Sequence, residues 1–115
     1  MNINELIAQA HETALKKGWW DDDPPTMSKL MLIVTEVAEA AEELRDGVAE
    51  ANGYDVINYE HVSGAKPEGF STELADILIR VADLCGRYNI DLDRALEVKM
   101  AYNRTRPYRH GGKAA

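Results

Sequence analysis

The chain has 115 residues, of which 45% are hydrophobic and 29% are charged, and its formal net charge is −7. This length and composition fit one globular domain with a single core, covering residues 1–115. The acidic balance argues against a nucleic-acid polymer as partner, because such a partner needs a basic surface.

Apolar residues recur at helical spacing in four segments, and this pattern predicts an all-α fold. The predicted helices cover residues 3–17, 27–46, 71–88 and 92–104. Side chains suited to capping precede the last three segments, namely Thr26 or Ser28, then Ser71, then Asp91.

Two connectors between these helices carry unusual residues. The first holds Trp19 and Trp20, followed by three aspartates and two prolines. The second covers about residues 47–70 and is rich in glycine, which is longer than a typical connection and therefore indicates a functional or mobile segment. Within it, residues 55–59 could form either a short strand or a helical turn.

Nothing in the chain predicts export or membrane insertion. The N-terminal stretch lacks the basic and apolar regions of a signal peptide, and no apolar run approaches the ~20 residues of a membrane span. The single cysteine, Cys85, permits no intramolecular disulfide, so we expect a reduced, cytoplasmic protein. Cys85 lies among apolar residues, and we expect it to fill the core.

Two acid pairs at matched spacing are the chemically most informative feature. Glu36 and Glu39 lie three residues apart in the second helix, and Glu73 and Asp76 repeat this spacing in the third. Residues three apart share a helical face, so two neighbouring helices can bring four carboxylates together. Oxygen ligands in such a group suit a hard divalent cation such as Mg2+.

The same residues have a plainer interpretation. The chain contains 20 acids in 115 residues, so acid pairs at this spacing also arise by chance. Asp76 with Arg80, and Asp83 with Arg87, could form ion pairs four residues apart and make this strip an ordinary solvated face.

The apolar residues of the second and third helices differ in extent. The second helix carries a narrow apolar stripe formed by Leu30, Val34, Val37, Ala41 and Leu44. The third carries an apolar arc wider than one partner helix covers, so we expect it to pack on several neighbours, including another subunit.

The fourth helix combines an apolar face with polar residues that continue it. Leu92 and Leu96 mark an inward face, and Lys99, Asn103 and Arg106 extend it. These polar side chains could meet a polyanion near the carboxylates, or they could snorkel where the helix leaves the core.

The residues that follow, 104–115, form a basic tail. Its candidate phosphate ligands are Arg106, Arg109, His110 and Lys113, which lie near two glycines. The tail could equally be a frayed terminus.

Over about residues 28–106 the chain resembles the all-α nucleoside triphosphate pyrophosphohydrolases of the MazG type, which include dCTP pyrophosphatases and dimeric dUTPases. The matching motifs are Glu36-x-x-Glu39, Glu73-x-x-Asp76 and Lys99-x-x-x-Asn103. The resemblance implies a four-helix bundle that is completed by oligomerisation, as a homodimer or a homotetramer.

The resemblance also implies an activity and roles for the residues. The reaction is Mg2+-dependent hydrolysis of a nucleoside triphosphate to a monophosphate and pyrophosphate, with Mn2+ as an alternative cation and removal of non-standard nucleotides as one role. The implied ligands are Glu36, Glu39, Glu73 and Asp76, one glutamate acting through water as base. Lys99 and Arg106 would hold phosphates, and Asn103 would fix sugar or phosphate.

For the base, the aromatic candidates are Trp19 and Trp20. Two adjacent tryptophans often include a core anchor, so we expect one to pack and the other to face the ligand. Stacking of a base on the exposed ring is tolerant of base identity. His11 is expected on the helix surface. The preferred base is not specified by the sequence.

Two other classes of protein could carry paired acids on helices. A di-iron carboxylate bundle needs Glu-x-x-His pairs, and neither Glu36 nor Glu73 has a histidine three residues on. A non-catalytic acidic helical module for assembly or regulation stays as the alternative.

Overall fold

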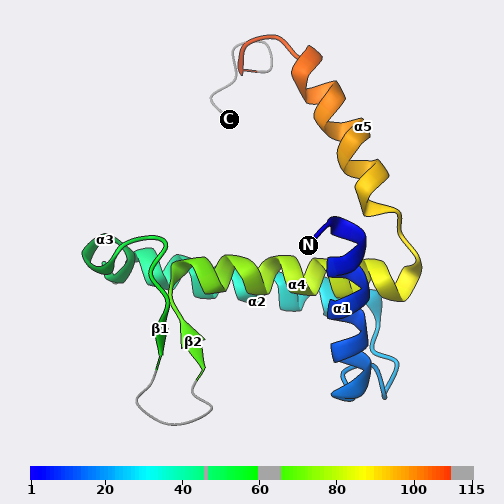
Figure 1. Cartoon of the computed structure of the whole chain (residues 1–115), viewed down its shortest axis with the longest axis horizontal. Coiled ribbons are helices and arrows are strands. Elements are labelled where there is room, and N and C mark those ends of the chain that lie inside the picture. The colour runs from blue at the N-terminus through cyan, green and yellow to red at the C-terminus, as the bar shows by residue number, and fades with distance from the viewer. Residues whose placement is uncertain (46, 60–65, 110–115) are drawn as a thin grey trace.

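Five helices and one short β-hairpin make up the part of the chain that the computed structural model describes, residues 1–45, 47–59 and 66–109 (Figure 1). The all-α class expected from the sequence is therefore confirmed. The helices are α1 (Ile3–Lys16), α2 (Thr26–Arg45), α3 (Val48–Asn52), α4 (Phe70–Tyr88) and α5 (Leu92–Thr105). The strands are β1 (Asn58–Tyr59) and β2 (Pro67–Glu68).

The four long helices agree with the predicted ones within one residue at each end, but their caps agree less well. The Asp91 side chain accepts a hydrogen bond from the Arg94 N–H, as predicted. The expected caps at the start of α2 were wrong, because α2 already begins at Thr26, directly after Pro25. Ser71 is not the cap of α4 either, since that position belongs to Gly69.

The long connector contains the hairpin and α3, which was not predicted. Strand β1 pairs antiparallel with β2, with Asn58 opposite Glu68. A strand was thus the correct alternative for this part of residues 55–59. Gly69, between β2 and α4, packs closely on Val56 just before β1: its φ is +141°, and an added Cβ would collide with the Val56 carbonyl oxygen.

The body of the molecule is an antiparallel pair of helices, α2 and α4, with α1 crossing α4 (Figure 1). Small side chains let these helices approach closely. The buried apolar residues are Ala10, Ala14, Trp20, Ala40, Ala49, Ala82 and Cys85. Cys85 is therefore core filler, as expected.

Large apolar side chains remain outside this small core. The predicted stripe of α2 is exposed rather than buried, with Val34 56% exposed and Val37 50% exposed. On α4, Leu74 is 44% and Leu78 is 58% exposed. The core of this chain therefore uses only part of the apolar surface of α2 and α4.

Helix α5 projects away from the body (Figure 1) and buries none of its residues. The expected inward face is therefore not formed, because Leu96 is exposed and only Leu92 is half-buried. Among the residues that the structure describes, no helix combines the length and apolar character needed to cross a membrane.

Candidate metal centre

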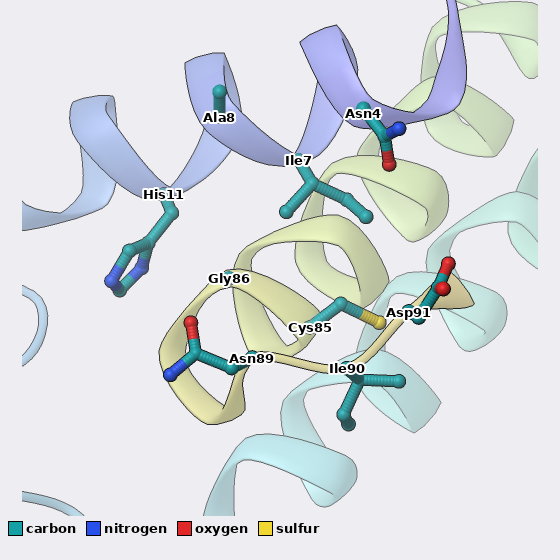
Figure 2. Close-up of a pocket in the computed structure, with 9 residues that line it drawn as sticks. All are labelled: Asn4, Ile7, Ala8, His11, Cys85, Gly86, Asn89, Ile90 and Asp91. Atoms are coloured by element: carbon teal, nitrogen blue, oxygen red, sulfur yellow. The ribbon is translucent and has the colours of Figure 1, made fainter. Parts of the chain in front are cut away.

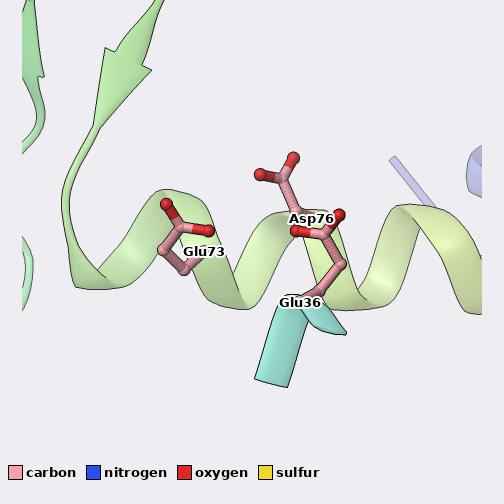
Figure 3. Close-up of side chains that lie close together, drawn as sticks. All are labelled: Glu36, Glu73 and Asp76. Carbon is pink, nitrogen blue, oxygen red and sulfur yellow. The ribbon is translucent and has the colours of Figure 1, made fainter. Parts of the chain in front are cut away.

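Three carboxylates converge where α2 crosses the first turns of α4. Glu36 comes from α2, and Glu73 and Asp76 come from α4 (Figure 3). One carboxylate oxygen from each lies within 4.8 Å of the others. Glu36 is 8% exposed and Glu73 is 6% exposed, so two of the three acids are withdrawn from water. The structure thus brings together members of both predicted acid pairs.

The fourth predicted acid, Glu39, lies beside this trio rather than within it. Its side chain is exposed, yet its charge acts on Glu73. One helical turn separates Glu39 from Glu36, which explains why both reach the same region. A ligand in the centre would therefore meet three close acids and an exposed fourth.

The electrostatics of the trio are unfavourable without a cation. Burial, followed by the nearby charges of Glu39 and Asp76, raises the pKa of Glu73 from 4.5 to about 7. Burial and then Glu36 also raise the pKa of Asp76. The Oε2 atom of Glu73 is buried and has no hydrogen-bond partner among the residues that the structure describes. An unsatisfied buried carboxylate oxygen next to like charges is what a divalent cation would relieve.

A cavity of about 340 Å3 opens beside the trio, and we call it the acidic cavity. It is lined by Trp19, Glu36, Glu39, Lys66, Asp76, Ile79 and Arg80. It therefore combines carboxylates, two cations and an aromatic ring.

The ion pairs expected along α4 are wrong. The Arg80 Nε donates a hydrogen bond to Glu36 Oε1 across the helices at 2.7 Å, instead of pairing with Asp76. Arg87 pairs with Asp23 at 2.9 Å, instead of pairing with Asp83. Arg80 thus pairs across the helices with a buried carboxylate, which gains more from a cation than an exposed one does. Arg87 instead pairs with the exposed Asp23 of the connector, while the oxygens of Asp83 are bound by Trp20 and His11.

The two tryptophans differ as expected, one packed and one exposed. Trp20 is 4% exposed, and its Nε1–H donates to both oxygens of Asp83, at 2.9 and 3.1 Å. Trp19 is 46% exposed and lines the acidic cavity. Lys29, which the sequence did not single out, holds this segment: its Nζ donates to the Trp19 carbonyl at 3.0 Å and lies 4.2 Å from the Trp20 ring centroid. A lysine one turn into a predicted helix belongs to no recognised motif, so the sequence did not indicate this role.

His11 is not a surface residue, contrary to expectation. Its side chain is 19% exposed, and its Nδ1 lies 2.8 Å from Asp83 Oδ1. His11 also lines a larger cavity of about 480 Å3 between α1 and the end of α4 (Figure 2). The acid of that cavity, Asp91, already caps α5, so no group of carboxylates converges there.

The predicted substrate residues on α5 are not brought to the acidic cavity. Lys99 and Arg106 flank the Tyr102 ring, at 5.4 and 5.6 Å from its centroid, and Asn103 lies exposed on the same helix. The snorkelling alternative fails too, since α5 has no buried stripe. Arg109 is exposed. The remaining two tail candidates, His110 and Lys113, lie outside the described residues.

The fold and the centre define an all-α protein with a buried acidic cluster beside a lined cavity. Comparisons with models of protein families, with curated proteins and with solved structures found no match for this chain.

Proposed function

We propose that this chain is a Mg2+-dependent nucleoside triphosphate pyrophosphohydrolase of the MazG-like type. The proposal is carried by one observation: Glu36, Glu73 and Asp76 offer oxygens within 4.8 Å of one another. It is supported by the buried Oε2 of Glu73, which finds no partner in the described part of the chain. This donor set, made only of carboxylates, fits Mg2+, or Mn2+ in its place, better than a soft metal.

The trio would hold the cation, with Glu39 next to it. When bound, a divalent cation neutralises phosphate oxygens and opens the α-phosphorus to attack by water. Glu39 is exposed at the mouth and can orient that water or accept its proton. Without a cation the pKa of Glu73 is raised to about 7, so a cation binding at neutral pH would displace a proton from this carboxylate.

Trp19 supports a nucleotide as the substrate. It exposes its ring at the acidic cavity, and its backbone is held by Lys29. A planar base stacked on it would gain about 1–3 kcal/mol without strong choice between bases. Phosphates attached to such a base would extend toward the carboxylates in the same cavity.

We further propose a homodimer or homotetramer as the working form. The exposed apolar side chains of α2, α4 and α5 would be covered by another copy. In such an assembly Lys99, Asn103 and Arg106 could reach the acidic cavity of a neighbouring subunit, which they do not reach in their own. A reducing cytoplasm is retained as the compartment, because the chain has one cysteine.

The test is pyrophosphate release from a panel of standard and modified nucleoside triphosphates with and without Mg2+. We expect release only with a divalent cation, and a loss of about 100-fold or more in Glu36→Gln and Asp76→Asn. Glu12→Gln on the surface of α1 is the control and should stay active. A folded wild-type protein that turns over no nucleotide would instead favour the non-catalytic acidic module.

A further inference from the structure

Two cations line the acidic cavity, and neither has a role in the function proposed so far. Among the residues that the structure describes, Lys66 and Arg80 are the basic side chains on its wall. Carboxylates alone would repel a polyphosphate, so a cavity that admits one needs fixed positive charge as well. The α5 cations do not supply it within one chain.

Arg80 lies between the aromatic and the acidic parts of the cavity. Its guanidinium carbon is 5.9 Å from the Trp19 ring centroid, and its Nε donates to Glu36 Oε1 at 2.7 Å. The described residues offer its guanidinium no second hydrogen bond. A planar guanidinium with N–H groups to spare is suited to binding phosphate oxygens.

The contact with Glu36 is one that Arg80 would lose when the cavity is filled. Glu36 belongs to the trio that offers its oxygens to a cation. Once Glu36 turns to a cation, the guanidinium is left partly buried, at 30% exposure, without its counter-charge. A phosphate oxygen beside the trio would replace that counter-charge.

Lys66 reaches the cavity from the long connector. It precedes β2 directly, and its charge acts on both Glu73 and Asp76 from the cavity wall. The backbone just before β1 packs closely on the start of α4, where Gly69 leaves no room for a Cβ beside the Val56 carbonyl. This contact places the backbone of Lys66 at the cavity, although its side chain is exposed.

We propose that Arg80 and Lys66 form the polyphosphate-binding side of the acidic cavity, and that Arg80 exchanges Glu36 for a phosphate oxygen when substrate and cation enter. This inference rests on the proposed function, since it concerns the same cavity. The sequence predicted phosphate binding by residues of α5 and the basic tail. The inference assigns this role to Arg80 of α4 and Lys66 of the connector instead.

The test compares two affinities in solution, measured by titration calorimetry: that for Mn2+ alone and that for inorganic pyrophosphate in the presence of Mg2+. The variants are Arg80→Gln, Arg80→Lys and Lys66→Gln. The matched control is Arg87→Gln, which removes an arginine from the same helix whose partner is Asp23. Thermal unfolding of each variant shows whether it is folded.

For Arg80→Gln we expect changes of opposite sign. The affinity for pyrophosphate should fall about tenfold or more, because a charge-assisted contact is lost. The affinity for Mn2+ alone should rise about two- to fivefold, because a partly exposed ion pair no longer competes for Glu36. Arg80→Lys should recover part of the pyrophosphate affinity. Lys66→Gln should lower that affinity about threefold, and the Arg87 variant should change neither.

Other results would overturn the inference. If Arg80→Gln lowers both affinities, Arg80 only holds Glu36 in place; if both Arg80→Gln and Lys66→Gln leave pyrophosphate binding unchanged, the cations do not bind phosphate. Failure of the proposed function has a different signature. If the variants show these affinity changes but the wild-type protein hydrolyses no nucleoside triphosphate, the protein binds polyphosphate without being the enzyme.

Discussion

Glu73 is buried in the first turn of α4 between two other acids, and this position determines how it responds to pH. The N-terminal turn of a helix favours a negative charge, but burial and the charges of Glu39 and Asp76 oppose it. The opposing effects win, since the pKa is raised to about 7. Without a cation, this carboxylate costs the protein stability at neutral pH.

The stability of the metal-free protein should therefore fall as the pH rises from about 4.5 to about 7. The folded pKa of Glu73 lies above its ordinary value of 4.5, so in this window the folded protein keeps a proton that the unfolded chain releases. Denaturant unfolding at pH 5 and pH 8 should differ by about 1–3 kcal/mol. Glu73→Gln should flatten this slope and leave the smaller contribution of Asp76, whose pKa is also raised.

Glu12→Gln is the control for this measurement. Glu12 is exposed, and Lys16 lowers its pKa, so its removal should leave the fall between these pH values unchanged. Mg2+ should stabilise the wild type more at pH 8 than at pH 5, and should not stabilise Glu73→Gln to the same extent. A flat profile in the wild type would contradict the charge conflict at Glu73.

At the scale of elements, long helices were predictable and short ones were not. Segments with several turns repeat their apolar pattern often enough to identify the helix, and α5 was bounded by Asp91 as well. Helix α3 has five residues and each strand has two, too few for any period to show. For the region of β1, the sequence left strand and turn open because the partner strand β2 is not adjacent in the sequence.

In the candidate metal centre, the sequence could predict only those residues whose placement follows from helical spacing. Spacing placed Glu36 with Glu39 and Glu73 with Asp76, and the structure brings three of these acids together. The partner of Arg80 could not be predicted, since spacing along one helix does not say which helix lies alongside. Lys66 could not be predicted either, because a residue in a connector belongs to no helical repeat that would place its side chain.

The hairpin offers an element-scale prediction through Gly69. Gly69→Ala should destabilise the protein by about 2 kcal/mol or more, because φ of +141° disfavours a side chain and the new Cβ would collide with the Val56 carbonyl. Denaturant unfolding measures the loss. The affinity for pyrophosphate should fall as well, since Lys66 lies on this hairpin.

Gly47→Ala is the matched control. Gly47 also has a positive φ, +72°, but an added Cβ meets no atom of the described residues within 4 Å. It should cost only about 1 kcal/mol, the backbone part of the effect. Equal losses at the two positions would show that the hairpin is not held against α4 as described.

At the scale of the whole molecule, one small core supports a much larger apolar surface. The residues buried between α1, α2 and α4 are mostly alanines, while Val34, Leu78 and Met100 lie half or more exposed. Helical periodicity identifies apolar faces but does not say whether a face packs inside its own chain or against another. This is why the α2 stripe was correctly found and yet is not core.

The projection of α5 raises the same question for the candidate metal centre: whether the polar residues of α5 act in their own chain or in another copy. Lys99 and Asn103 match the motif on which the resemblance rests, but they lie on a helix that leaves the body. If they act on substrate, they must act in a cavity of another copy. The proposed oligomer thus makes a claim that can be tested without knowing its geometry.

Mixing two inactive variants should restore activity. Glu36→Gln destroys the acid trio and Lys99→Ala removes a cation from α5, so each homo-oligomer should be impaired. In a mixed dimer refolded from both chains, one site combines an intact trio with an intact α5 of the partner. Random mixing makes about half the dimers mixed, so about one quarter of the wild-type activity should return.

The control is a mixture of Glu36→Gln with Asp76→Asn. Both changes fall in the same acid trio, so no pairing of these chains gives a site with both an intact trio and an intact α5 of the partner. That mixture should remain inactive in the same pyrophosphate-release assay. Recovery in the first mixture alone places α5 across the subunit boundary. If the first mixture stays as inactive as the second although size measurements show mixed oligomers, Lys99 does not serve a partner's cavity, and the phosphate contacts must come from the cavity's own Arg80 and Lys66.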